Sequence, residues 1–518
     1  MVSGEGSSSV TDSISSVSGE LEDISVQEAI DQIKTSSSSL NVEKLWKVLE
    51  SVVTKGNGSQ LIQSGIIGFL VESLQVEDKS WNFDLNSASE SARYTHPLRV
   101  LSSLQDASEE LVSAATLHVN PNLPWTSQEN SKLASTYISL VPQISIPTYI
   151  QKYLMPHLLA VSKSSFHPKI SSTSGYKKSA GETNSNLGGL KPVLGFSSTS
   201  SEEEDLRRNW KHSNRVDSLS MVWYLIERID SSDSEYWPLI TSFILNVIED
   251  HEPLFKTRGC QLLHLLVNQQ ASHSFLTRSG LIDLFIESTK VSLSYLPNLT
   301  PEPISVYLLS EAYPSITKLL SIKAQAKSTS LDSANLLFVS LVNENILQSI
   351  QHISGSSSHK LTNLLLSNII QVVKYHLGAN VIICLSRILF SVNQIIVNPS
   401  TLETADISIG LTSIKLGLLI HKCIIELFAE EDHEGKLALL QYKYDFLGAW
   451  SVLYLRLTKY IKDSEEKSHI LSTTKNNVSI LKEISASAGE IEAFQSDLDK
   501  MTATNRELLG LFSPAAID

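Results

Sequence analysis

The residues best suited to metal chemistry in this sequence are His251, Cys260 and His264. Cys260 and His264 are four residues apart, so on a helix they would share one face, whereas His251 precedes them in a turn. A structural zinc ion needs four ligands, and this set falls short, so we expect no metal site here. His421 and Cys423 are two residues apart and would face away from each other on a helix.

The motifs that support catalysis or nucleotide binding are missing from the sequence. There is no GxxxxGK[ST] phosphate loop, no GxSxG, no HExxH and no CxxC pair. Acidic residues are scattered and form no recognisable acid and base pair. We therefore expect a protein without catalytic residues and without a cofactor. An enzyme whose groups converge from distant positions is the third hypothesis, and a cleft of titratable groups would support it.

The overall charge argues against nucleic acid as a partner. The 518 residues include 41 Lys and Arg against 55 Asp and Glu, a formal net charge of −14. Broad binding to a phosphate backbone needs a basic face, and the bases here are not gathered into long runs. We expect no nucleic-acid partner.

Cysteine usage and hydropathy bear on the compartment. The three cysteines are widely spaced in apolar stretches, so a disulfide framework is not expected and a reducing compartment fits. The first residues, MVSGEGSSSV, lack the basic and apolar regions of a signal peptide. The most apolar stretch, 361–397, is interrupted by charged residues, which favours two buried helices over a membrane span. We expect no membrane association.

The stretch from Trp237 to Leu266 has the pattern of a helical hairpin, and the chain is organised around it. Apolar residues recur at helical spacing on both sides of a short turn. They are Trp237, Ile240, Ile244, Val247 and Ile248 before the turn, and Phe255, Gly259, Leu262, Leu263 and Leu266 after it. Pro253 fits where the second helix begins, because proline has no N–H and its ring pre-sets the helical φ. We assign Trp237 and Pro253 as structural residues.

The spacing at this turn is typical of a HEAT repeat. Asp250 ends the first helix, Phe255 and Lys256 follow five and six residues later, and Gly259 follows nine residues later. Gly259 costs about 1 kcal/mol against alanine inside a helix, which predicts the close approach of another helix. Arg258 is either an exposed contact with a partner or half of an ion pair between repeats. The candidate partner-binding residues are Asp250, His251, Lys256 and Arg258.

Helical periodicity continues through most of the chain, without sustained alternation of period two. The prediction is an all-α fold: a HEAT-like α-solenoid of antiparallel helix pairs, a smaller helical N-terminal block and disordered serine-rich segments. From 206 to 483 we expect no sheet. The expected parts are a disordered tail at 1–25, an N-terminal helical block at 26–161, a flexible serine-rich linker at 162–205, a HEAT-like repeat domain at 206–483, and a C-terminal capping helix and tail at 484–518.

The serine-rich linker buries too little apolar surface to fold by itself, so we expect it to be mobile and protease-sensitive. Thr199, Ser200 and Ser201 each precede a glutamate by three residues. Acid-directed phosphorylation there is the alternative to a plain solvated linker.

Five motifs follow one another in the middle of the chain. They are Trp237-Pro238, IEDHEPLFKTRGCQLLHLL at 248–266, SGLIDLF at 279–285, SLSYLPNLTPEP at 292–303 and Glu311-Ala312-Tyr313. Their order resembles the Tti family, specifically the second Tti subunit of the TTT (Tel–Tti–Tti) complex. In the Leu-Pro segment we assign Tyr295 and Pro297 as structural residues.

The resemblance implies a non-catalytic scaffold subunit of a cochaperone. The TTT complex acts with the heat-shock protein 90 chaperone on phosphatidylinositol-3-kinase-related kinases, which links it to TOR signalling, the DNA-damage response and telomere maintenance. The implied direct partners are the Tel subunit and the other Tti subunit, itself a helical-repeat protein. The expected location is cytoplasmic and nuclear. The alternative is another HEAT-repeat adaptor, such as a transport or kinase-regulatory scaffold.

Overall fold

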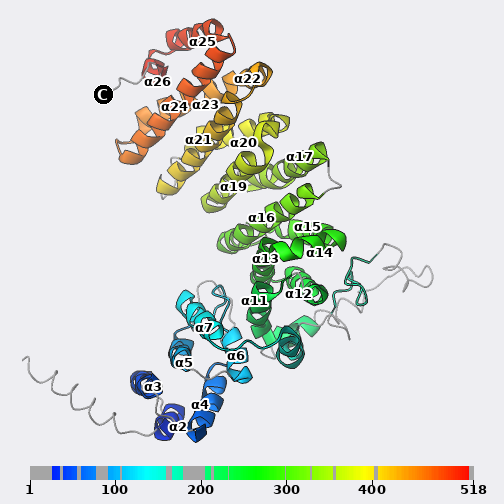
Figure 1. The fold of residues 1–518 in the computed structure, drawn as a ribbon. Coiled ribbons are helices and arrows are strands. Elements are labelled where there is room, and N and C mark those ends of the chain that lie inside the picture. The colour runs from blue at the N-terminus through cyan, green and yellow to red at the C-terminus, as the bar shows by residue number, and fades with distance from the viewer. Residues whose placement is uncertain are drawn as a thin grey trace, which may run out of the picture. The chain divides into compact units, whose positions relative to one another are not determined.

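The structure is a computed structural model of the chain, drawn in Figure 1. It describes residues 26–512 with gaps at 36–38, 55–59, 77–90, 105–107, 159–165, 179–204, 212–214, 231–232, 298, 327–329, 354–357 and 402–406. The predicted tail at 1–25 lies outside the described residues. These residues form two compact units. Unit 1 comprises the described residues up to Asp250 together with Gln269–Phe275, and unit 2 comprises His251–Asn268 and the described residues from Leu276 onward.

Unit 1 is built of short helices, and several of them pack on the helix two positions further along the chain. They are α2 (Val26–Thr35), α3 (Ser39–Thr54), α4 (Gln60–Ser73), α5 (Ala92–Ser103), α6 (Glu109–Thr116), α7 (Gln128–Leu140), α8 (Ile146–Tyr149), η1 (Ile150–Leu154), η2 (Met155–His157), a helix at 205–211, η3 (Arg215–Asp217), α11 (Ser218–Arg228), η4 (Ser234–Tyr236) and α12 (Trp237–Ile248). Helix α5 packs between α3 and α7, and α6 packs on α4. Thr95 on α5 donates to Asn130 Oδ1 on α7 at 2.9 Å, which fixes their register.

The segment 166–178 packs on α12, which differs from its assignment to a flexible linker. The backbone N–H of His167 donates to the Ser242 hydroxyl on α12. Gly175 has a φ of 70°, and a Cβ at this position would overlap the ring of Pro238, also on α12. Composition alone missed this packing because few residues carry it, one of them a glycine in the left-handed region. Most of the predicted linker, 179–204, lies outside the described residues.

Unit 2 contains the longer helices. They are α13 (Pro253–Asn268), α15 (Leu281–Ser292), α16 (Glu302–Gln325), α17 (Leu331–Ser340), η5 (Leu341–Ile346), α18 (Leu347–Ile353), α19 (His359–Val372), η6 (Val373–Leu377), η7 (Gly378–Ile383), α20 (Leu385–Val397), η8 (Pro399–Thr401), α21 (Ile407–Ala429), α22 (His433–Leu440), α23 (Lys443–Tyr460), α24 (Glu465–Ser487), α25 (Ile491–Thr504), η9 (Arg506–Leu508) and α26 (Leu509–Phe512). Helix α14 (Gln270–Arg278) is divided between the two units.

Two rows of helices run through unit 2, as Figure 1 shows. In the first row α13 packs on α16, α16 on α19, α19 on α21 and α21 on α24. Arg258 on α13 donates a hydrogen bond to Tyr307 on α16, and Gln261, further along α13, donates to Glu311, further along α16. The two helices therefore run in the same direction. The bonds between α21 and α24 follow the same order. The second row contains α20 and α23, which pack on each other and on their first-row neighbours α21 and α24.

These two rows of packed helices confirm the predicted all-α, HEAT-like α-solenoid. The described residues contain no β-strand, and Ile170 and Lys177 form one isolated bridge. The apolar stretch 361–397 lies in two helices, His359–Ile383 and Leu385–Val397, which together are apolar enough for a membrane span and meet at a bend of 112°. Within α21, Ser408–Ala429 is long and apolar enough to cross a membrane, with a mean hydropathy of 1.4. More than half of that helix is buried within unit 2, as expected of a core helix.

The observed division of the chain differs from the predicted domain boundaries. It falls at Asp250, inside the predicted repeat domain, because the helix at 205–211, α11 and α12 belong to unit 1. The predicted end at 483 lies inside α24, which continues to Ser487. Helical periodicity reports which face of a helix is buried but not which helix covers it, so it places such boundaries poorly. Beyond α24, only Phe494 and Leu498 are buried on α25, which therefore has the polar outer face of a terminal helix.

Candidate protein-interaction surfaces

The acid that ends the first helix of the predicted hairpin is held inside unit 1 by two bases. Asp250 is 4% exposed, and its Oδ1 lies 3.0 Å from Lys211 Nζ. Arg207 Nη1 lies 4.0 Å from the other carboxylate oxygen, and Arg207 also donates to the carbonyl of Asn246 on α12. The sequence analysis missed both bases. Their spacing of four residues puts them on one face of the helix at 205–211, which is the signal that could have found them.

Glu249, next to Asp250, ties the segment 166–178 to the end of α12. His167 Nε2 lies 2.8 Å from one carboxylate oxygen of Glu249, and Lys169 Nζ lies 3.1 Å from the other. Burial acts to raise the pKa of Glu249, but the hydrogen bond and charge of His167 and the charge of Lys169 outweigh it and lower the pKa to about 2. The carboxylate therefore stays ionised through the physiological range.

Lys256 and Arg258, which the sequence analysis named as partner contacts, are both buried within unit 2. Lys256 Nζ lies 5.4 Å from the ring centroid of Tyr295, a cation–π contact between two residues singled out separately from the sequence. Arg258 Nη1 donates to Tyr307 OH at 2.6 Å and to Gln261 Oε1 at 3.0 Å, and burial lowers the pKa of its guanidinium. Of the two alternatives for Arg258, an exposed contact does not fit. Its hydrogen bond to Tyr307 on α16 links neighbouring helices, but it is not the ion pair that the second alternative predicted.

Of the four predicted partner-binding residues, only His251 is exposed. A buried side chain offers a partner little surface, so Asp250, Lys256 and Arg258 fit a structural role. Contact of His251 with a partner stays a prediction.

The residues assigned as structural lie in or beside the packed core. Trp237 is the first residue of α12 and is fully buried, and Pro253 is the first residue of α13. Tyr295 and Pro297 are half-buried between α15 and α16. Gly259 is buried on α13.

His251, Cys260 and His264 were the residues best suited to metal chemistry, and all three lie in unit 2. Burial raises the pKa of the Cys260 thiol to about 12, which favours its protonated form. The described residues contain no group of three or more His, Cys, Asp or Glu side chains placed to hold a metal ion.

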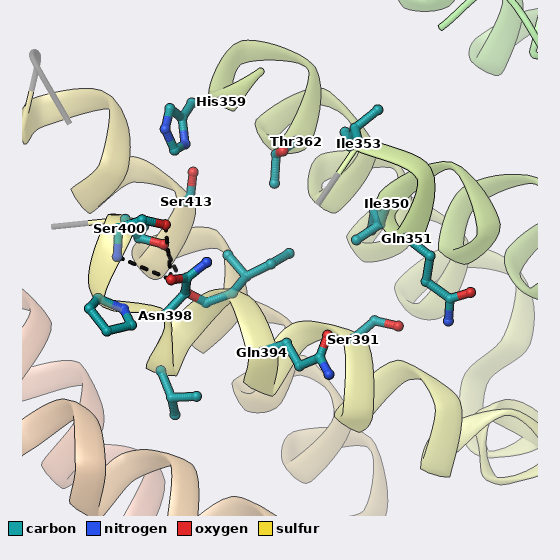
Figure 2. A pocket seen from close by; sticks show the side chains of 14 residues that line it. Ile350, Gln351, Ile353, His359, Thr362, Ser391, Gln394, Asn398, Ser400 and Ser413 are labelled. Carbon is teal, nitrogen blue, oxygen red and sulfur yellow. Dashed lines mark hydrogen bonds between the residues drawn. The ribbon is translucent and has the colours of Figure 1, made fainter. Parts of the chain in front are cut away.

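A cavity of about 440 Å³ opens at one edge of unit 2, where η8 meets the ends of α18, α19, α20 and α21 (Figure 2). Hydroxyl and carboxamide groups line it beside aliphatic walls, and among its described lining residues none is Asp, Glu, Lys or Arg. Ser413 donates its hydroxyl to Asn363 Oδ1 at 2.5 Å, so His359 does not activate it. Asn398 Oδ1 accepts from the backbone and hydroxyl of Ser400. The lining can form hydrogen bonds but offers no acid and base pair for catalysis.

The second row of unit 2 exposes large apolar side chains on two neighbouring helices. Phe390 on α20 is 58% exposed, and Tyr444 and Val452 on α23 are 59% and 37% exposed. Gly448 lies four residues from each of the latter two, is itself exposed, and would have nothing within 4 Å of an added Cβ. We call Phe390, Tyr444, Gly448 and Val452 the α20–α23 face.

A hydrogen bond shows that the two helices of the α20–α23 face lie side by side at this level. Asn393, one turn after Phe390, donates from Nδ2 to the carbonyl of Asp445 at 3.0 Å. Helical periodicity in the sequence marks only the buried stripe of α23, which contains Phe446 and Trp450, and so does not reveal this face. A glycine between two apolar residues on the opposite stripe was the available signal.

Comparison with known proteins gives one family. A model of the Tti2 family matches residues 111–403, more than half of the chain. No curated protein matches. Solved structures similar to this chain include an engineered protein, with 12% identity, a TM-score of 0.26 and coverage of 94% of this chain and 96% of that chain. They also include SYS-1, with 12% identity, a TM-score of 0.29 and coverage of 95% and 91%. Both TM-scores lie well below 0.5, so neither likeness bears on function.

Proposed function

The chain belongs to the Tti2 family, and from this membership we propose that it supports the folding, assembly and stability of phosphatidylinositol-3-kinase-related kinases together with the heat-shock protein 90 chaperone. Family membership implies a role as a subunit of the TTT complex, and the family is one of non-catalytic scaffolds. The observation that carries the proposal is the match over 111–403, which includes every motif of the resemblance.

The packing of unit 2 supports a scaffold role. Helix pairs stacked in rows present long surfaces, and extended surfaces suit protein partners. The partners we propose are the other Tti subunit and the Tel subunit by direct contact, and the chaperone and the client kinases indirectly. The location we propose is cytoplasmic and nuclear. The pathways that would depend on this role are TOR signalling, the DNA-damage response and telomere maintenance. Another HEAT-repeat adaptor, for transport or kinase regulation, is the alternative.

Depletion of the chain in its own cells tests the proposed function. Steady-state amounts of the phosphatidylinositol-3-kinase-related kinases should fall several-fold, with their transcripts unchanged, because incompletely folded kinase is degraded. An unrelated kinase that also depends on heat-shock protein 90 serves as the control and should keep its level. If the client kinases kept their amounts after complete depletion, the adaptor alternative would replace the proposal.

A further inference from the structure

We propose that the cavity where η8 meets the ends of α18, α19, α20 and α21 binds a short, uncharged, extended peptide segment of a partner protein (Figure 2). The inference does not depend on the proposed function, because it rests on the lining of the cavity alone. The volume of about 440 Å³ lies within the range of about 300–1,000 Å³ that ligand pockets have. The segments 354–357 and 402–406 lie outside the described residues and are not included in the proposed site.

Ser391 is the residue that indicates a ligand in this cavity. It lines the cavity from α20, is 3% exposed, and its hydroxyl has no hydrogen-bond partner within the described residues. A buried hydroxyl without a partner destabilises the fold, and a serine in a helix can avoid this by bonding the carbonyl one turn back. The hydroxyl of Ser391 forms no such bond. A hydrogen bond with a ligand would satisfy it.

Three uncharged hydrogen-bonding side chains follow one stripe of α20 and its C-terminal end. Gln394 lies three residues after Ser391, and Asn398 lies four residues after Gln394, so they share one face, and all three line the cavity (Figure 2). Asn398 Oδ1 already accepts from Ser400, which leaves its Nδ2 to donate. At a rise of about 1.5 Å per residue this stripe is about 10 Å long. Three residues of an extended chain span the same length, at about 3.3 Å each.

The groups on this stripe match the amide groups of a peptide backbone. A carboxamide both donates and accepts, so the side chain of Gln394 can bond the N–H and the C=O of an extended segment, and the hydroxyl of Ser391 can do either. Ile350 and Ile353, both on α18, add an aliphatic wall to the cavity. This wall suits one aliphatic side chain of the bound segment.

The described lining residues do not suit the other common classes of ligand. None of them is Lys or Arg, which would pair with a phosphate or a carboxylate, and none is Asp or Glu, which would pair with an ammonium group. None is Phe, Tyr or Trp, on which a nucleobase or the face of a sugar would stack. An uncharged amide with an aliphatic side chain is the class that fits.

The test measures the Kd of the purified full-length chain for the blocked peptide N-acetyl-Ala-Leu-Ala-amide, by ligand-observed NMR titration. Ser391→Ala should raise the Kd about three- to tenfold, because it removes one hydrogen bond. Its melting temperature should not fall, because the hydroxyl has no partner within the described residues to lose. Gln394→Leu, at an exposed position, should also raise the Kd. In the matched control Ser315→Ala, a buried serine loses its bond to the carbonyl of Cys260, so stability should fall and the Kd should not change.

Three further probes test the chemistry of the occupant. N-acetyl-Ala-Lys-Ala-amide and N-acetyl-Ala-Asp-Ala-amide should bind more weakly than the leucine peptide, because a charge would be desolvated without a partner of opposite sign. N-methylacetamide, a single amide group, should bind more weakly than all three peptides.

Each part of the inference has its own contradicting outcome. No saturable binding of the leucine peptide to the wild type would overturn it, as would binding that Ser391→Ala and Gln394→Leu leave unchanged. A fall in the melting temperature of Ser391→Ala as large as that of Ser315→Ala would show that the hydroxyl belongs to the core and not to a site. Tighter binding of a charged peptide, or equal binding of N-methylacetamide, would contradict an uncharged extended segment as the occupant. None of these outcomes bears on the proposed function.

Discussion

Asp250 and Glu249 are neighbours at the end of α12, yet they meet their bases in different surroundings. Asp250 is buried with Lys211, whereas Glu249 is partly exposed between His167 and Lys169. Breaking a buried ion pair leaves an uncompensated charge, while an exposed one contributes little. The two acids therefore lead to different predictions.

Asp250→Ala should lower the free energy of unfolding by about 3–5 kcal/mol, because it strands the buried ammonium of Lys211. This exceeds the cost of about 0.5–2 kcal/mol that a helix-capping role would give. Denaturant titration of the variant measures it. The control is Asp250→Ala combined with Lys211→Met, which removes both charges and should recover part of the loss. A cost below about 1 kcal/mol for the single variant would show that the pair contributes no more than an exposed one.

Glu249 should contribute stability that depends on pH. Its pKa in the folded chain is lowered to about 2, below the ordinary value of 4.5, so its contribution is present above about 4.5 and is lost as the pH falls toward 2. Glu249→Gln removes this contribution. The difference in unfolding free energy between wild type and variant should shrink as the pH falls below about 4.5. A difference that does not change with pH between 5 and 3 would contradict the ionic role.

At the scale of elements, the contact of α13 with α16 joins the most features that the sequence singled out. The carbonyl of Cys260, next to Gly259, accepts a hydrogen bond from Ser315 Oγ at 3.0 Å. A side-chain hydrogen bond to a main-chain atom of the neighbouring helix requires the two helices to lie close together at this point. The close approach of a helix at Gly259 itself stays a prediction.

Gly259→Leu should destabilise unit 2, because a large side chain must fit at a buried position of α13. Overpacking of this kind costs about 1–3 kcal/mol. The loss should spread along the row, since stacked helix pairs depend on their neighbours, and capture of the other Tti subunit should fall with it. Thermal melting and a capture assay measure both effects, with Gly259→Ala as the milder control. Unchanged stability and capture in Gly259→Leu would refute the close-packing explanation.

At the scale of the whole molecule, the helical period predicted the fold but not its division. Apolar spacing on α12 and α13 identified both helices with their buried residues, including Trp237 and Phe255. The packing of 166–178 and the ion pair of Asp250 depend on segments distant in sequence, and local patterns carry no information about them. The partner-binding prediction at Lys256 and Arg258 followed their charge, although these long side chains are buried against tyrosines.

The most direct test of the account is affinity purification of the full chain from its own cells under native conditions, followed by quantitative mass spectrometry. The account predicts that one other Tti subunit and one Tel subunit are recovered in amounts equal to the chain, with heat-shock protein 90 and client kinases at lower amounts. Recovery of the chain without a Tti and a Tel partner, or with transport factors in their place, would contradict it.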